Sequence, residues 1–190
     1  LEMWEQFDNP VNIYSSIDHC DERAEYIRSG TKWADIEQNI KTLLLEPNVN
    51  LQISSTISML NYPTLEEFYK KMLQTGLMPG GDWQLNPVSN PAWISVFNLP
   101  QDLKDKGRQG IENIVKYVTS KERLILTYRK RQYDFEHTVA NISSFPDLVD
   151  SSGKDFEDVR EEFIAETTRL DKLRNENFVE VFPELRHLYE

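Results

Sequence analysis

Cysteine is nearly absent, since the 190-residue chain contains Cys20 and no other. A single thiol excludes an internal disulfide and a zinc site built from several cysteines. It is compatible with a reducing environment, so we predict a cytoplasmic protein. His137 and His187 lack the spacing of metal ligands, and no metal site is predicted.

Long hydrophobic runs are absent too, since no stretch approaches the roughly 18 consecutive apolar residues that suggest a membrane-spanning helix. The first residues, LEMWEQFDNP, lack the basic end and apolar centre of a secretory signal. The chain starts at Leu1 rather than at methionine, and we therefore expect it to be a piece of a longer protein.

Positive charge is in deficit, with 21 basic against 32 acidic residues and a net charge of -11. Nucleic acids and anionic membranes both require clustered positive charge, so neither is a predicted partner. The basic run Arg129-Lys130-Arg131 falls in a helix-like segment and is typical of a solvated helix face. Glycine-rich phosphate loops are missing as well, because the Gly80-Gly81 pair indicates a turn.

Alternation of apolar and polar residues is what the first half of the chain contains. In residues 11–18, Val11, Ile13 and Ile17 fall on one side of an extended chain, and asparagine, tyrosine, serine and aspartate fall on the other. This pattern predicts a β-strand with one apolar and one polar face. Two later segments repeat it: residues 50–60 and 82–89.

Helical spacing separates these strands, in residues 31–45 and again in residues 64–76. Thr64 and Glu67 have the spacing of a capping box, and Gly76 is a typical helix stop. The order strand, helix, strand, helix, strand, with long connections, predicts the parallel sheet of an α/β fold.

The polar strand faces are unusual, because strands of a doubly covered parallel sheet are apolar on both sides. Two arrangements explain them. Either the sheet curves into a partial (β/α) barrel whose polar faces line a wet cavity, or it is flat and its polar face meets water. We favour the lined cavity. Three strands cannot form a full barrel, so the predicted fold class is an α/β partial-barrel fragment.

The second half of the chain lacks strand alternation. Three segments show apolar positions at helical spacing: residues 101–120, 121–145 and 156–178. Residues 146–155 are expected to form a loop. We therefore predict two regions, with the strands in residues 1–99 and a helical C-terminal extension in residues 100–190.

Reactive groups gather after the first strand. Asp18, Glu22 and Glu25 are suited to acid–base work, to cation binding or to capping the next helix. Arg28 is suited to bind a ligand carboxylate through two hydrogen bonds, or to form a salt bridge with Glu25 or Glu22. Cys20 is not expected to be a nucleophile, because a thiol needs a base and neighbouring residues on a strand point in opposite directions. No catalytic residue is assigned.

Three stretches, YSSIDHCDERAEYIRSGTKWADIEQNI, NLQISSTISMLNYPTL and NPVSNPAWISVFNLPQDLK, resemble the later half of the barrel of a radical S-adenosylmethionine (SAM) enzyme. The closing TTRLDKLRNENFVEVFPEL is similar to the tail of members with a short twitch domain. The resemblance covers nearly the whole chain. It implies a partial (β/α) barrel that binds a [4Fe-4S] cluster through a CxxxCxxC loop and uses SAM to form a 5′-deoxyadenosyl radical.

The resemblance also implies where SAM would bind. The first strand would contact its ribose or amino-acid part, the second strand its ribose, and the third its adenine or the substrate. Arg28 is then the candidate for the SAM carboxylate. The implied cofactor-binding residues are Ser16, Asp18, Arg28, Ser54, Thr56, Asn61, Gln84 and Asn86.

One departure from the family is large, because the CxxxCxxC loop is missing and one cysteine cannot hold a cluster that needs three. We therefore expect a fragment of a radical SAM enzyme, inactive alone, with the cluster present only in the full-length parent. Its expected partners are the missing N-terminal half of the barrel and a small-molecule or peptide substrate. Two alternatives are a non-catalytic module that holds a peptide or nucleotide-like ligand, and a hydrolase with Asp18 and Glu22 as paired carboxylates.

Overall fold

A three-stranded parallel sheet forms the centre of the first half of the chain. The computed structural model describes residues 4–6, 8–78, 83–120 and 135–190. The strands are β1 (Val11–Ser16), β2 (Val49–Ile57) and β3 (Trp83–Pro87), in the order β1-β2-β3. β2 pairs in parallel with both neighbours, so the predicted parallel α/β sheet is confirmed. The sheet is open rather than closed into a barrel.

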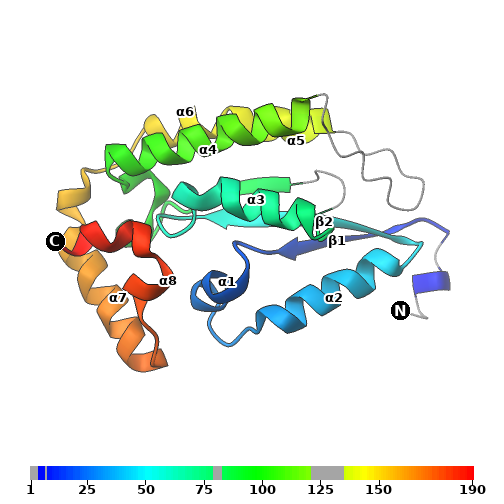
Figure 1. The fold of residues 1–190 in the computed structure, drawn as a ribbon, viewed down its shortest axis with the longest axis horizontal. Helices are drawn as coiled ribbons and strands as arrows, with labels where there is room; N and C mark the ends of the chain where they lie inside the picture. Colours follow the sequence, from blue (N-terminus) through cyan, green and yellow to red (C-terminus); the bar gives the residue numbers. More distant parts are fainter. Residues whose placement is uncertain (1–3, 7, 79–82, 121–134) are drawn as a thin grey trace.

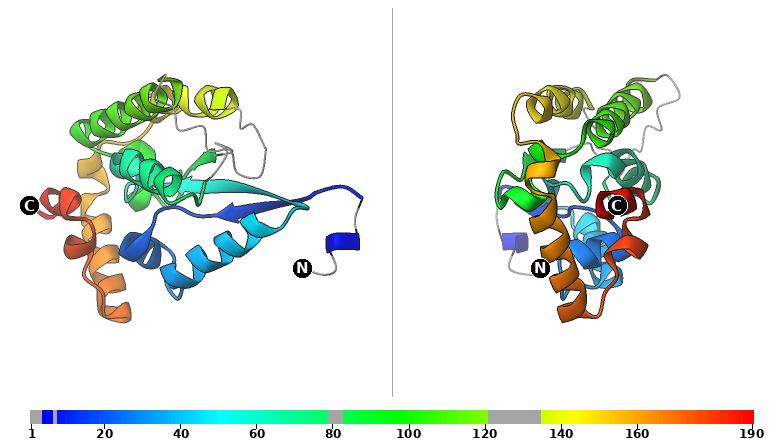
Figure 2. Two further views of the ribbon diagram at one scale, coloured as in Figure 1. Left: turned by 45° about the vertical axis from the view of Figure 1, so that its right-hand side comes forward. Right: turned by 90° about the vertical axis from the view of Figure 1, so that its left-hand side faces the viewer.

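Helices cover one side of this sheet (Figures 1 and 2). α1 (Asp21–Ile27) and α2 (Trp33–Leu45) join β1 to β2, while η2 (Tyr62–Thr64) and α3 (Leu65–Gln74) join β2 to β3. The apolar strand positions are buried or half-buried on this side, and the most buried include Ile53 and Ile57 at 2% and 0% exposure. The polar positions on the other side are exposed or half-buried. The alternation of apolar and polar residues therefore reflects a sheet that helices cover on one side.

The chain after β3 is mainly helical, as predicted. Its elements are η3 (Ala92–Ile94), η4 (Val96–Asn98), α4 (Gln101–Thr119), α5 (Phe135–Ser143), α6 (Phe145–Asp150), η5 (Phe156–Asp158), α7 (Arg160–Arg174), α8 (Phe178–Val181) and η6 (Pro183–Tyr189). The helix predicted over residues 121–145 lies partly outside the described residues, and its described part is α5. None of the helices in the described ranges is long and apolar enough to cross a membrane.

Two local predictions are wrong. The loop expected over residues 146–155 begins as helix α6, because Pro146 sits in the first turn, where its missing N–H is not needed, and the flanking Phe145 and Val149 are buried. The capping box also fails, since the Thr64 hydroxyl makes no cap bond to α3 and bonds elsewhere. By contrast, Gly76 ends α3 as predicted, with φ of 73°.

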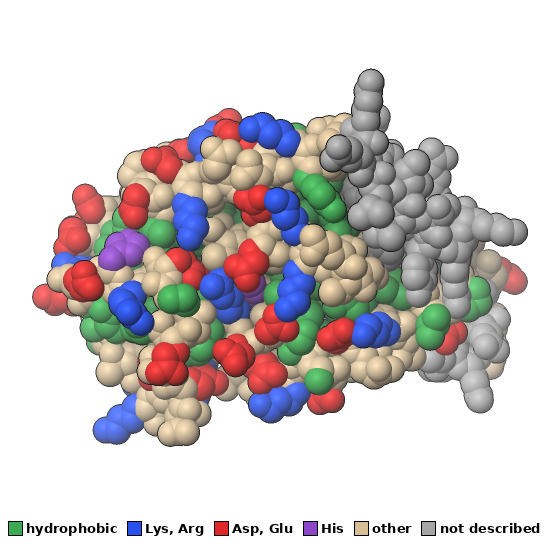
Figure 3. All heavy atoms as spheres, in the orientation of Figure 1, with side chains coloured by type: hydrophobic (Ala, Val, Ile, Leu, Met, Phe, Trp, Pro, Cys, Tyr) green, Lys and Arg blue, Asp and Glu red, His purple; other side chains and the backbone are tan. Residues whose placement is uncertain are grey.

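The two regions predicted as residues 1–99 and 100–190 share one hydrophobic cluster, to which α3, α4, α7 and η6 all contribute. α4 approaches η2 closely at Gly107, where an added Cβ would lie 2.3 Å from a ring carbon of Tyr62. A glycine is therefore required inside this helix by packing. On the side drawn in Figure 3, acidic and basic side chains are interspersed over the helices.

The C-terminal helices α7 and α8 are fixed against α1, beside the carboxyl ends of the strands (Figure 1). The buried Tyr26 hydroxyl donates to Asp171 Oδ1 at 2.9 Å, and Asp171 Oδ2 accepts from the Phe178 N–H at 2.8 Å. Burial and this carboxylate raise the pKa of Tyr26. Arg23 of α1 adds an ion pair with Glu184 of η6 at 3.0 Å. These contacts hold the C-terminal segment against α1, the helix that follows β1.

Candidate functional site

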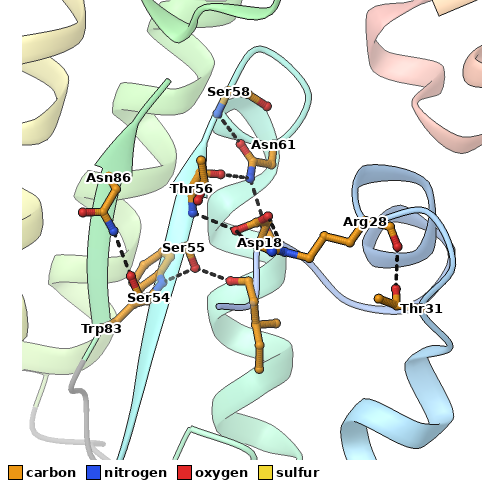
Figure 4. A network of polar contacts seen from close by, with 11 residues as sticks. Asp18, Arg28, Thr31, Ser54, Ser55, Thr56, Ser58, Asn61, Trp83 and Asn86 are labelled. Carbon is orange, nitrogen blue, oxygen red and sulfur yellow. Dashed lines mark hydrogen bonds and ion pairs between the residues drawn. The ribbon is translucent and has the colours of Figure 1, made fainter. Parts of the chain in front are cut away.

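The polar side chains of the three strands meet on the open face of the sheet. Ser16 lies opposite Ser54 in the strand register, and Ser54 lies opposite Gln84. Thr56 lies opposite Asn86, whose Nδ2 donates to Ser54 Oγ at 2.9 Å (Figure 4). The structure therefore brings these five residues together on one face, which we call the polar face.

The covered face carries two serines, Ser15 and Ser55, of which Ser55 is fully buried. Ser55 is 0% exposed and donates from Oγ to the Ile17 carbonyl oxygen at 2.5 Å. Its oxygen also accepts from Trp83 Nε1 at 2.8 Å, so its hydrogen-bonding capacity is used inside the fold. A polar residue on this face thus serves packing and not a ligand.

Asp18 and Arg28 bind each other just beyond the end of β1. Arg28 Nε donates to Asp18 Oδ2 at 2.8 Å, and Arg28 Nη2 donates to Oδ1 at 3.2 Å. The same Oδ1 accepts the Thr56 N–H at 2.7 Å, and the Asp18 side chain is 4% exposed. The salt bridge of Arg28 is therefore made with Asp18 rather than with Glu25 or Glu22.

The other two carboxylates near this end have separate surroundings. Glu25 Oε1 accepts the N–H of Trp33, the first residue of α2, at 2.9 Å, and Oε2 pairs with Lys32 at 2.9 Å. These bonds lower the pKa of Glu25, first through Lys32. Glu25 is thus a helix cap, one of the roles that the sequence suggested, while Glu22 is exposed on α1.

Asn61 ties the ends of β1 and β2 together and is 0% exposed. Its Nδ2 donates to the carbonyl oxygens of Asp18 and Thr56 at 3.0 and 2.9 Å, and its Oδ1 accepts the Ser58 N–H at 2.8 Å (Figure 4). Both N–H donors of the amide are used by backbone carbonyls, and its oxygen accepts a backbone N–H. Asn61 and Asp18 therefore support the polar face from behind, whereas Arg28 lies at its rim.

His19 and Thr64 belong to the same end of the sheet and were not among the predicted site residues. His19 Nδ1 accepts the Cys20 N–H at 2.9 Å, and Nε2 contacts Thr64 Oγ1 at 3.2 Å. Burial and the nearby Arg23 lower the pKa of His19 to about 4. Nothing in the local sequence pairs residues 19 and 64, which the fold alone brings together.

The Cys20 thiol is buried at 2% exposure. Burial, together with Asp21, raises the pKa of Cys20 to about 12. At neutral pH the residue is a protonated thiol, which is neither a nucleophile nor a metal ligand. No group of three or more histidine, cysteine, aspartate or glutamate side chains in the described ranges is arranged to hold a metal ion.

In comparisons with known proteins, no family model, no curated protein and no solved structure matches the chain.

Proposed function

We propose that this chain is the C-terminal half of a radical SAM enzyme barrel and that its polar face contributes to binding SAM and a polar substrate. The single observation that carries the proposal is the in-register alignment of hydrophilic side chains across three parallel strands whose other face is covered by helices. The sequence resemblance supplies the family.

The sequential strand order supports a curved, barrel-like arrangement. In doubly wound folds the strand order reverses, so that helices lie on both faces of the sheet. The order β1-β2-β3 with helices on one side is instead that of consecutive units in a (β/α) barrel. In such a barrel the uncovered face is the interior, and the proposal is that the polar face lines it beside the bound molecule.

The iron–sulfur cluster of the family does not fit this chain. Cluster ligation needs several cysteine thiolates, and Cys20 is single, buried and protonated at neutral pH. The described residues also bring no set of three candidate ligands together. The proposal therefore assigns the cluster to the remainder of the parent protein.

The polar face does fit a ligand with the hydrogen-bonding groups of SAM. Ser16, Thr56 and Gln84 are exposed, and Ser54 and Asn86 are half-buried beside them. These hydroxyl and amide groups both donate and accept, as recognition of a ribose or an amino-acid group requires. When bound at the cluster of such enzymes, SAM supplies radical chemistry; the residues here hold and orient it.

The free edge of β1 supports a partner segment next to it. Among the described residues β1 pairs with β2 only, and its sequence VNIYSS contains no charge and no proline. Natural edge strands usually carry such protective features. We assign this edge to the missing N-terminal half of the barrel.

The uncovered edge gives a test in solution. The isolated chain is expected to associate, because the unpaired N–H and C=O groups of β1 are open to another strand. Static light scattering over a range of protein concentrations measures the mass. A clean monomer at high concentration would count against a missing half.

Binding of SAM tests the proposed function directly. With only part of the barrel present, we expect a dissociation constant on the order of 1 mM, or about 4 kcal/mol, by isothermal titration calorimetry. Gln84→Ala should weaken it. The control Gln74→Ala, at another exposed glutamine at the end of α3, should not weaken it. Absence of SAM binding by the folded chain would overturn the proposal.

A non-catalytic binding module is the second candidate, favoured by the hydrogen bonds that Asp18, Arg28 and Asn61 make within the fold. The same bonds remove support for a hydrolase, because Asp18 is buried in an ion pair and has no free oxygen for a water. The DNA sequence upstream of the Leu1 codon distinguishes the radical SAM enzyme from the binding module. A CxxxCxxC pattern supports the radical enzyme, and a start codon at the boundary supports the module.

A further inference from the structure

We infer that His19 is a positioning residue of the polar face, acting through Thr64 and Asn61 on the strand ends that carry Asp18 and Thr56. The inference rests on the proposed function, since the spacing of these strand ends matters for activity only if the polar face binds a ligand.

The strand ends need such a support because the backbone ladder stops short of them. The last ladder bond between β1 and β2 runs from the Ile17 N–H to the Ser54 carbonyl at 3.1 Å. Beyond it, the Asp18 carboxylate accepts the Thr56 N–H, and the Asn61 amide donates to the carbonyl oxygens of both residues. The position of Asn61 therefore sets the separation of the two strand ends.

The hydrogen bonds behind Asn61 run in one direction. His19 Nδ1 lies 2.9 Å from the Cys20 N–H nitrogen and 3.4 Å from the Cys20 carbonyl oxygen. We assign the shorter contact as the hydrogen bond, which makes Nδ1 the acceptor and leaves the ring proton on Nε2, the donor to Thr64 Oγ1 at 3.2 Å. The Thr64 hydroxyl then donates to the main-chain carbonyl oxygen of Asn61 at 3.3 Å. Every member has its partner, which makes a buried network rigid.

The ring of His19 has little room to leave this position. It is 1% exposed and packs against the Phe68 ring with centroids 5.5 Å apart. The charged neighbours that act on it are Asp21 and Arg23 on α1 and Lys71 on α3. Two cations against one anion, together with burial, hold the imidazole neutral at physiological pH, so Nδ1 keeps the lone pair that accepts the Cys20 N–H.

Two substitutions break the chain of hydrogen bonds from His19 through Thr64 to Asn61, which we call the relay, at different points. Thr64→Val removes the hydroxyl and keeps the side-chain shape, while His19→Asn keeps an acceptor for the Cys20 N–H and loses the donor to Thr64. Each should weaken SAM affinity by about tenfold, or about 1.4 kcal/mol. The double variant should be no weaker than the single ones, because both act along one path.

Thr138→Val is the matched control. Thr138 of α5 is buried like Thr64, at 0% against 7% exposure, and its Oγ1 has no hydrogen-bond partner in the described part of the chain. This variant should leave SAM affinity unchanged. Thr64→Ser, which restores the hydroxyl, should recover the affinity lost in Thr64→Val, and this separates the relay from a general loss of folding.

NMR spectra of the free protein give a readout that does not depend on SAM. Thr64→Val should shift the Asn61 side-chain amide signal and the backbone amide signals of Ser16 and Thr56. Unmoved signals with unchanged SAM affinity would overturn the inference and leave the proposed function intact. If Thr64→Val moves these signals but the wild-type chain binds no SAM, the proposed function is overturned and the positioning by His19 stands.

Discussion

Ser54 and Ser55 are neighbours on β2, yet they lie on opposite faces of the sheet and differ in what they can do. Ser54 is half-buried on the polar face, where its hydroxyl accepts from Asn86. Ser55 is fully buried on the covered face, between a backbone carbonyl and an indole N–H. The same residue type is therefore part of the packed core on one face and partly exposed to solvent on the other.

Packing on the covered side should break most severely at Gly107. Gly107→Ala would place a Cβ 2.3 Å from the Tyr62 ring, so we expect a loss of at least about 3 kcal/mol in the free energy of unfolding. Gly110→Ala is the control in the same helix. Its Cβ would meet the Glu66 Cβ at 3.5 Å, and better helix propensity should stabilise it by up to about 1 kcal/mol. Urea unfolding measures both, and equal effects would contradict the packing argument.

Acid should weaken the covered side through His19. Its pKa is lowered from 6.5 to about 4, so between these values the unfolded chain binds a proton that the folded protein does not. The stability linked to this residue is complete above pH 6.5 and falls by about 3 kcal/mol as the pH approaches 4. Urea unfolding across this range should show a shallower decline for His19→Asn. Parallel curves for the two proteins would refute the linkage.

The two serines give the sharpest comparison of the faces and the smallest effects. Ser55→Ala leaves the Trp83 N–H buried without a partner, so we expect a cost of about 1 to 3 kcal/mol. Ser54→Ala on the polar face should change the stability by less than about 0.5 kcal/mol. Chemical denaturation compares the two variants directly. Similar losses would mean that the polar face is also part of the structural core.

The strands and their faces could be predicted because a period of two is a local property of the sequence. Ile53 and Ile57 mark the covered face, and the intervening Ser54 and Thr56 mark the polar face. The parallel order followed from connections too long for hairpins. The alternation did not predict that the residue at position 55 on the covered face would be a buried serine whose hydroxyl is hydrogen-bonded within the fold.

The contacts at the strand ends could not be predicted in the same way. Thr64 had the sequence spacing of a cap, but His19, which is 45 residues away, takes its hydroxyl as a partner. Arg28 had two acidic neighbours in sequence, yet the fold brings Asp18 to it instead. Such pairings depend on tertiary approach, and a single sequence carries no signal of it.

The predicted ligand contacts therefore divide into two groups. Alternation correctly places Ser16, Ser54, Thr56, Gln84 and Asn86 on one open face, where their role toward SAM stays a prediction. Asp18 and Asn61 use their polar atoms within the fold, so a supporting role suits them better than direct contact. Residue type alone does not distinguish these two roles.

The lone thiol at the end of β1 gives the molecule a built-in reporter. Cys20 is buried beside the His19 ring, and its thiolate is strongly disfavoured. An alkylating reagent can therefore reach the Cys20 thiol only when the structure around Cys20 and His19 opens locally. Because no second cysteine contributes to the signal, the labelling rate of the unaltered protein would report the rate of local opening at the end of β1.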